Sequence, residues 1–168
     1  MASKNLTQAR TPDQVADPLS LGRLGDFVGF RLRRVQNLLS RKFAQATAEM
    51  GLRSGLFSSL AIIGANPGVS QSELSREVGL DKSVTVTIVD ELEKYGWAER
   101  RRAKHDRRRH ALYITPEGDR QLDALFRQME VVESAALHQL TEAEHAMLNE
   151  LLDRMYQAVV READRTTS

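Results

Sequence analysis

Residues 69–115 read VSQSELSREVGLDKSVTVTIVDELEKYGWAERRRAKHDRRRHALYIT, and the opening of this stretch marks a short helix. Ser70 and Glu73 have the spacing of a capping box, in which each side chain satisfies a free backbone N–H group of the first turn. Gly79 supplies the left-handed residue that ends such a helix. The sequence therefore predicts a short capped helix followed by a tight turn.

A second helix and a β-hairpin follow this turn. The helix is predicted from about Lys82 to Tyr95, with Asp81 as its cap and Gly96 at its end. Residues that favour extended backbone then occupy 97–102 and 110–114, on either side of a basic turn, which predicts a hairpin. This order of elements is typical of a winged helix-turn-helix, a fold that binds double-stranded DNA.

The second helix has two faces of different character. One face is predicted to pack against the body of the domain and carries Thr85, Ile88, Val89, Leu92 and Tyr95. The opposite face is predicted to enter a major groove and carries Ser83, Val86, Thr87, Asp90 and Lys94. Hydroxyls can bond base edges or phosphates, and a valine can touch a thymine methyl.

The predicted DNA contacts come from three elements. The first helix offers free backbone N–H groups to a phosphate, the second reads bases, and the hairpin brings arginines to the backbone or minor groove. The predicted contacts are Ser70, Gln71, Ser72, Lys82, Ser83, Val86, Thr87, Lys104, Arg107, Arg108 and Arg109. A basic run alone is equally often a solvated face, but its place after two capped helices favours DNA contact.

Apolar stripes on both sides of this stretch predict further helices. Leu19 to Met50 is predicted as one amphipathic helix and Leu52 to Ala65 as a more buried one. Thr115 caps a third, and Thr141 with Glu144 forms a second capping box before the last. These stripes are either intramolecular core or a dimer interface, and their combined length favours a homodimer.

The predicted fold class is mostly α: a winged helix-turn-helix with a two-stranded β wing and a helical dimerisation region formed by N- and C-terminal helices. The expected segments are a flexible tail at 1–18, an N-terminal dimerisation helix at 19–50, the DNA-binding domain at 51–115 and C-terminal dimerisation helices at 116–164.

The motifs from Leu80 to Gly96 and from Asp106 to Gly118 resemble those of the multiple antibiotic resistance regulator (MarR) family of bacterial transcription factors. The likeness in element order runs from Leu19 to about Val160. It implies a homodimeric regulator in which the first helix and the last two helices interlock. Each subunit then places one reading helix and one wing on a pseudo-palindromic operator, and we expect repression.

The resemblance also implies roles within the wing. Asp106 would hold Arg108 by an ion pair, while Arg107 would reach the minor groove. The reading helix departs from the family, since residues 84, 86 and 87 are Val, Val and Thr where Thr, Thr and Arg are common. We therefore expect weaker direct readout, with more reliance on the wing and on DNA shape.

An effector pocket is a further expectation from the resemblance, because members that respond to small molecules bind them between the winged domain and the dimer helices. An anionic aromatic ligand is expected, such as a phenolic acid or its coenzyme A thioester, with an arginine pairing its charge. The candidate residues are Phe27, Phe30, Arg31, Arg34, Leu56, Phe57 and Ser59. The arginines are equally interpreted as solvated surface charges, and the alternative function is a constitutive or architectural DNA-binding protein.

Composition excludes several other classes. The 168 residues carry a formal net charge of +1 and no cysteine, which excludes disulfides and thiolate metal sites. The four histidines, His105, His110, His138 and His145, lack metal-ligand spacing, so no metal is predicted. No phosphate-cradling loop or nucleophile elbow is present, so neither an enzyme nor a cofactor is predicted. The absence of a secretory or membrane-spanning apolar run predicts a cytoplasmic protein.

Overall fold

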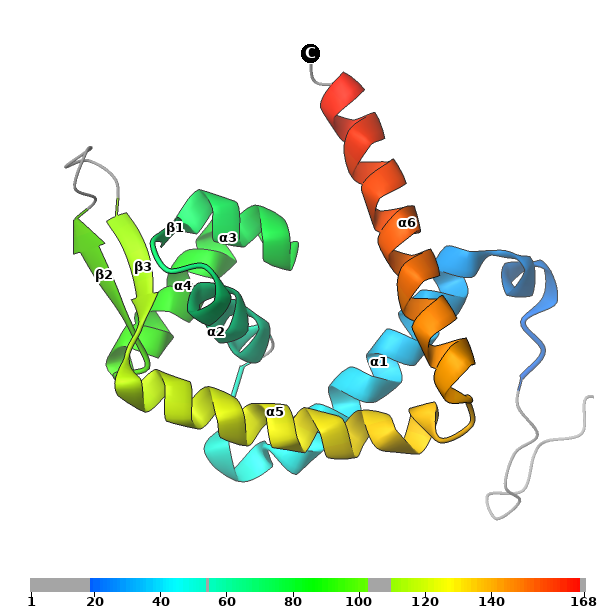
Figure 1. Ribbon diagram of the computed structural model, residues 1–168, viewed down its shortest axis with the longest axis horizontal. Coiled ribbons are helices and arrows are strands. Elements are labelled where there is room, and N and C mark those ends of the chain that lie inside the picture. The colour runs from blue at the N-terminus through cyan, green and yellow to red at the C-terminus, as the bar shows by residue number, and fades with distance from the viewer. Residues whose placement is uncertain (1–18, 54, 103–109, 167–168) are drawn as a thin grey trace, which may run out of the picture. The chain divides into compact units, whose positions relative to one another are not determined.

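The computed structural model describes residues 19–53, 55–102 and 110–166, and over these it is mostly helical with a small antiparallel sheet (Figure 1). The chain divides into two compact units, Met1–Gln36 and Asn37–Ser168. Each unit is described by itself below. The predicted mostly α fold class is confirmed.

The predicted single helix from Leu19 to Met50 is wrong at both ends. A 3₁₀ helix, η1 (Gly22–Asp26), comes first, and Phe27 is extended with φ −98° and ψ 115°, so α1 (Val28–Ala46) begins only after it. Gly22 has φ +49° and Arg31 Nε donates to the Gly25 carbonyl at 2.6 Å, which fixes this break. A second 3₁₀ helix, η2 (Ala48–Met50), follows α1.

Three helices form the centre of the second unit: α2 (Leu56–Ala65), α3 (Gln71–Val78) and α4 (Lys82–Lys94). The predicted capping box of α3 is confirmed, because Ser70 Oγ accepts from the Glu73 N–H while Glu73 accepts from the Ser70 N–H. Gly79 ends α3 with φ +70°, as predicted. Asp81 occupies the N-cap of α4 without a side-chain capping bond, so that part of the prediction is wrong.

The sheet contains the predicted hairpin and one additional strand. Strands β2 (Ala98–Arg102) and β3 (His110–Ile114) pair antiparallel, as expected for a wing. The additional strand, β1 (Val69–Ser70), pairs with the other side of β3, giving the order β1-β3-β2. The start of α3 is therefore hydrogen-bonded to the wing through the backbone.

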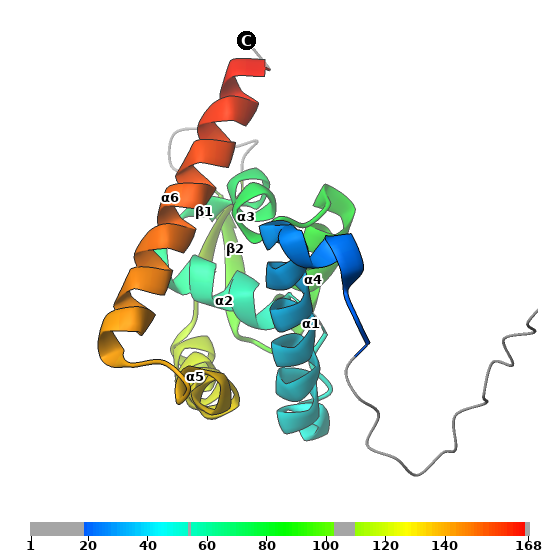
Figure 2. The ribbon, with the colours of Figure 1, turned by 90° about the vertical axis from the view of Figure 1, so that its right-hand side faces the viewer.

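The core lies where α2, α3 and α4 meet the sheet and the first half of α5 (Pro116–Leu137), as Figures 1 and 2 show. The largest side chains with no exposed surface are Leu56, Leu60, Ile63, Leu74, Ile88, Leu92, Leu112 and Leu125. Burial of these residues supplies the main stabilisation of the unit.

Helix α5 begins as predicted, with Thr115 as its cap and Pro116 in its first turn. Thr115 Oγ1 accepts from the Gly118 N–H at 2.9 Å and donates to the Gly96 carbonyl at 2.6 Å. A Cβ on Gly118 would lie 1.9 Å from the Trp97 carbonyl oxygen, so only glycine fits there. Helix α6 (Glu142–Thr166) follows and carries the predicted capping box of Thr141 and Glu144.

Candidate nucleic-acid interface

Helix α4 packs through the face that the sequence predicted, with one exception. Thr85, Ile88, Val89 and Leu92 are at most 1% exposed. Tyr95 is 42% exposed, so its predicted inward position is wrong. It stands at the C-cap, where the helix ends, and its ring stacks on Trp97 with centroids 4.8 Å apart.

The opposite face of α4 is open to solvent. The exposed residues along it are Lys82, Ser83, Val84, Val86, Thr87, Asp90 and Lys94. The structure thus places all four α4 residues predicted to contact DNA on one accessible helix that its core residues hold firmly.

At the start of α3 the three predicted contacts differ in accessibility. The Ser70 hydroxyl is engaged with Glu73, donating to its carboxylate at 2.5 Å. Ser72 is exposed, whereas the side-chain nitrogen of Gln71 is buried without a hydrogen-bond partner among the described residues. Of the three predicted contacts, Ser72 is therefore the one whose side chain is exposed, while the N–H groups of Ser70 and Glu73 are used by the capping box.

The predicted wing contacts at Lys104, Arg107, Arg108 and Arg109, and the expected pairing of Asp106, lie outside the described residues. On the flanking strand, Arg100 turns inward towards α4. Its guanidinium pairs with Asp90 at 2.7 Å and with Glu93, and its backbone N–H donates to Glu93 at 2.8 Å. This role of Arg100 was not predicted from the sequence.

Arg101 lies on the other face of the same strand, because side chains alternate along a strand. Its guanidinium carbon is 4.5 Å from the centre of the Tyr113 ring, and its Nε donates to Glu99 at 2.9 Å. The alternation of side chains along a strand could have predicted this difference from the sequence. Of consecutive arginines in β2, only every second one can lie on the outer face.

This arrangement of α3, α4 and wing coincides with a match of residues 57–109 to the family model described as MarR family. Over 143 residues the chain is 37% identical to a protein of Thauera aromatica named as a transcriptional regulatory protein for the hcr operon, covering 80% of this chain and 82% of that one. The chain belongs to the MarR family. As a member it is a DNA-binding transcriptional regulator and not an enzyme.

Two solved structures extend this comparison. The transcriptional repressor CouR bound to a 23-mer DNA duplex superimposes with a TM-score of 0.72 at 28% identity, covering 83% of this chain and 99% of that one. CouR from Rhodococcus jostii RHA1 bound to p-coumaroyl-CoA gives a TM-score of 0.68 at 28% identity, covering 79% and 93%. The MarR fold therefore extends over most of the chain.

The residues expected to bind an effector in this MarR-family regulator fall into both compact units. Phe27, Phe30, Arg31 and Arg34 belong to the first unit, where all but the half-buried Phe30 are exposed. In the second unit Leu56 and Ser59 are fully buried, and Ser59 Oγ has no hydrogen-bond partner among the described residues. Phe57 is half-buried and contacts two rings, Phe43 at 5.1 Å and Phe126 at 5.2 Å between centroids.

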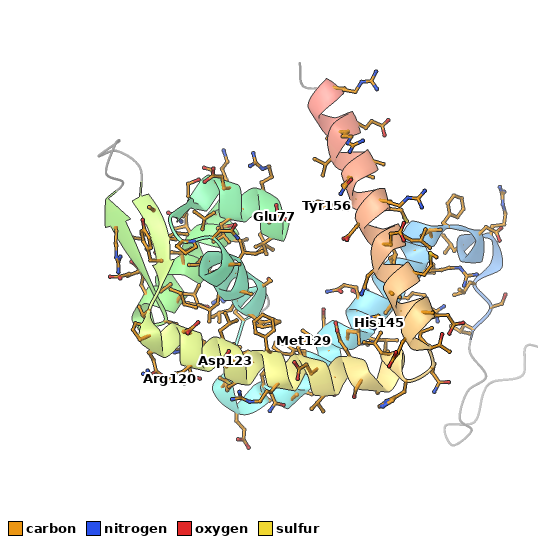
Figure 3. All side chains as sticks on the ribbon, in the orientation of Figure 1. Glu77, Arg120, Asp123, Met129, His145 and Tyr156 are labelled. Atoms are coloured by element: carbon orange, nitrogen blue, oxygen red, sulfur yellow. The ribbon has the colours of Figure 1, made fainter. Side chains whose placement is uncertain are left out.

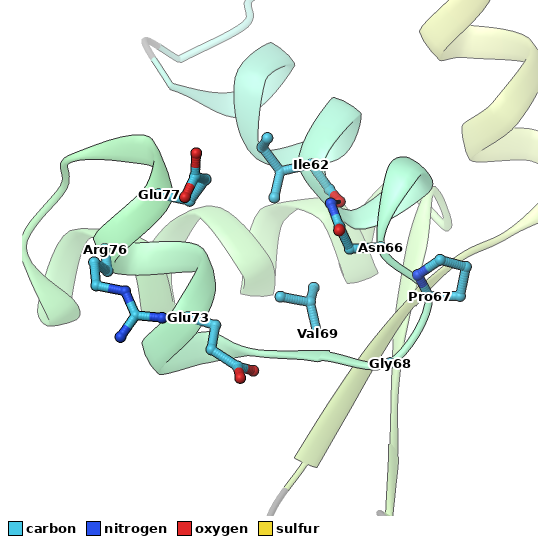
Figure 4. A pocket seen from close by; sticks show the side chains of 8 residues that line it. All are labelled: Ile62, Asn66, Pro67, Gly68, Val69, Glu73, Arg76 and Glu77. Atoms are coloured by element: carbon cyan, nitrogen blue, oxygen red, sulfur yellow. Dashed lines mark hydrogen bonds between the residues drawn. The ribbon is translucent and has the colours of Figure 1, made fainter. Parts of the chain in front are cut away.

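A pocket of about 690 Å³ lies at the end of α2, beside β1 and α3 (Figure 4). Its lining residues are Ile62, Asn66, Pro67, Gly68, Val69, Glu73, Arg76 and Glu77. None of the expected effector residues is among them. Two carboxylates beside one guanidinium make this pocket unsuited to an anionic aromatic acid.

The described ranges, 19–53, 55–102 and 110–166, contain no group of three or more His, Cys, Asp or Glu residues that could hold a metal ion. Among the same residues no helix is both long and apolar enough for a membrane span.

Proposed function

We propose that this MarR-family regulator is a homodimeric repressor that places α4 of each protomer in successive major grooves of a pseudo-palindromic operator. The observation that carries the proposal is the accessible polar and methyl-bearing face of α4, held by buried residues and flanked by the start of α3 and the wing. The likeness to CouR, solved on a DNA duplex, supports it.

A second copy of the chain is the proposed partner of the apolar side of α6. Two adjacent rows at four-residue spacing run along this helix, on which Figure 3 labels His145 and Tyr156. The exposed large apolar residues in these rows are Met147, Leu148, Leu151, Met155, Tyr156, Val159 and Val160. A stripe of this length is costly to leave in water, and a symmetric partner would cover it.

Footprinting tests the operator geometry. Hydroxyl-radical cleavage of a bound promoter fragment should protect two half-sites related by two-fold symmetry, with centres about 10 base pairs apart. Protection of a single unsymmetrical half-site would contradict the homodimer on a pseudo-palindrome.

Sedimentation velocity tests the dimer. Leu151→Glu places a charge in the apolar stripe and should shift the protein towards monomer at micromolar concentration. Gln157→Glu adds the same charge on the polar side of α6 and serves as the matched control, which should remain dimeric. If both variants sediment alike, α6 is not part of the dimer interface.

The proposed effector is an aromatic acid or its coenzyme A thioester, which would release the operator. Its support is the likeness to CouR, solved with p-coumaroyl-CoA, and the buried hydroxyl of Ser59, which has no hydrogen-bond partner in the described part of the chain. The test compares p-coumaroyl-CoA, p-coumarate and coenzyme A alone in thermal shift and in release of bound DNA. A response to p-coumarate, or to the thioester beyond that to coenzyme A, supports the proposal, whereas no response to any of the three contradicts it and favours the constitutive DNA binder.

A further inference from the structure

The accessible face of α4 consists of a central row with a valine on each side. Ser83, Thr87, Asp90 and Lys94 follow one another at three- and four-residue spacing and form the row. Val84 and Val86 flank it and are 40% and 44% exposed. The two valines lie on the same accessible face as the polar row, so a ligand on this face meets their methyl groups together with the polar side chains.

Two of the four polar side chains of the row are engaged within the protein. The Thr87 hydroxyl donates to the Ser83 carbonyl at 3.2 Å, which uses its proton inside the helix. The Asp90 carboxylate pairs with Arg100 at 2.7 Å, which offsets its repulsion of DNA phosphates. Because these two groups in the middle of α4 are already engaged, the methyl groups of Val84, Val86 and Thr87 are prominent among what it offers to a base edge.

Thymine is the natural base that presents a methyl group in the major groove, at C5, and 5-methylcytosine presents one at the same ring position. We propose that Val84, Val86 and Thr87 select the operator by apolar contact with the 5-methyl groups of pyrimidines rather than by a hydrogen-bond code. The proposal rests on the placement of α4 in the major groove under the proposed function. A 5-methylcytosine at a contacted position should then be bound in the same way as a thymine.

The test begins with an operator selected from random duplex DNA by the full-length protein. Each thymine of a half-site is replaced in turn by uracil, which removes the methyl group and keeps the pairing edge. Binding should weaken roughly fourfold at each contacted thymine, the loss expected for one buried methyl-sized group. Replacement of thymines outside the footprint is the control and should have no effect.

A second arm assigns the effect to residues. Val86→Ala and Val84→Ala should each bind the thymine operator more weakly. Each variant should also lose the response to uracil at one position, so that there the effects of the alanine substitution and of the uracil substitution are not additive. Alanine is a better helix former than valine, so these variants keep the fold of α4. Full additivity at every position would overturn the assignment to these side chains.

A third arm separates a methyl contact from a hydrogen-bond contact. Replacing a sensitive thymine by cytosine should weaken binding, and replacing it by 5-methylcytosine should restore most of the loss. No restoration at any sensitive position would overturn the proposal.

Lys82→Glu distinguishes failure of this proposal from failure of the groove placement, because it sets a negative charge at the start of α4 against the phosphates. If Lys82→Glu abolishes binding while uracil has no effect, methyl readout is refuted and the placement of α4 stands. If neither change matters, the placement of α4 is refuted as well.

Discussion

Arg100 of β2 and Asp90 of α4 are joined by an ion pair of 2.7 Å, and Glu93 holds the same guanidinium from the next turn of α4. The Arg100 side chain is only 18% exposed. An arginine in the most basic stretch of the chain is therefore used inside the protein, where it fixes the wing to the helix that it accompanies.

Removal of the Arg100 charge should weaken DNA binding without changing its salt dependence. Arg100→Gln frees β2 from α4 and should lower the free energy of unfolding by about 1 kcal/mol, because the pair is only partly buried. The slope of the logarithm of the binding constant against the logarithm of salt concentration should stay unchanged. Glu93→Gln is the matched variant, which breaks the same contact without removing a positive charge. A fall in slope of about 0.9 for Arg100→Gln would show instead that this arginine contacts a phosphate.

Loss of the capping box of α3 should destabilise the domain measurably. Ser70→Ala removes the acceptor of the Glu73 N–H and should lower the free energy of unfolding by about 1 kcal/mol. Chemical denaturation measures this difference. Ser72→Ala, in the exposed part of the same turn, should stay within about 0.5 kcal/mol of the parent protein. Equal losses for both serines would mean that the cap contributes nothing specific.

Alanine at position 118 should be far more damaging than alanine at another glycine. The added Cβ would lie 1.9 Å from the Trp97 carbonyl oxygen, so we expect a loss of about 3 kcal/mol or more, or failure to fold. Gly79→Ala is the control, since its φ is +70° but its Cβ meets nothing within 4 Å, and it should cost about 1 kcal/mol. Soluble yield and urea unfolding compare the two. Similar losses of stability in the two variants would disprove the close approach of Gly118 to the Trp97 carbonyl.

Acid should weaken the start of α6 through Glu144. The backbone N–H and the hydroxyl of Thr141 donate to this carboxylate and hold the pKa of Glu144 below its ordinary value. A depressed pKa stabilises the fold above the pKa of the unfolded chain, and this stabilisation is lost as pH falls through the folded-state pKa.

The comparison is urea unfolding of the parent protein and Glu144→Gln between pH 7 and pH 3. The difference in unfolding free energy should shrink towards acid, where both side chains are uncharged. A difference that stays constant over this range would show that the charge of Glu144 has no part in the cap.

Local chemistry made several elements of the fold predictable. The capping boxes at Ser70 and Thr141, the left-handed Gly79 and the cap at Thr115 all depend on residues at most a few positions apart. Their hydrogen bonds follow from spacing along the chain, so the predicted helix starts and turns on either side of α4 were correct, apart from the capping bond expected of Asp81. The accessible face of α4 followed from the same helical periodicity.

The remaining features depend on contacts between distant parts of the chain. Strand β1 has two residues, too few to show a strand period, and it exists because β3 lies beside it. The Arg100 pair joins positions seven and ten residues apart through a turn whose shape the sequence did not give. The break at Phe27 was missed because apolar spacing continued across it, although the backbone there is extended.

Backbone hydrogen bonds connect β1 to β3. The Gly68 N–H donates to the Leu112 carbonyl at 2.8 Å, and Val69 and Ser70 pair with Leu112 and Ala111. Because these bonds use main-chain atoms, they do not depend on the side chains on the accessible face of α4. If α4 reads the operator as proposed, mutations on its outer side would alter operator preference while this backbone frame persists, which would allow new specificities to be engineered on it.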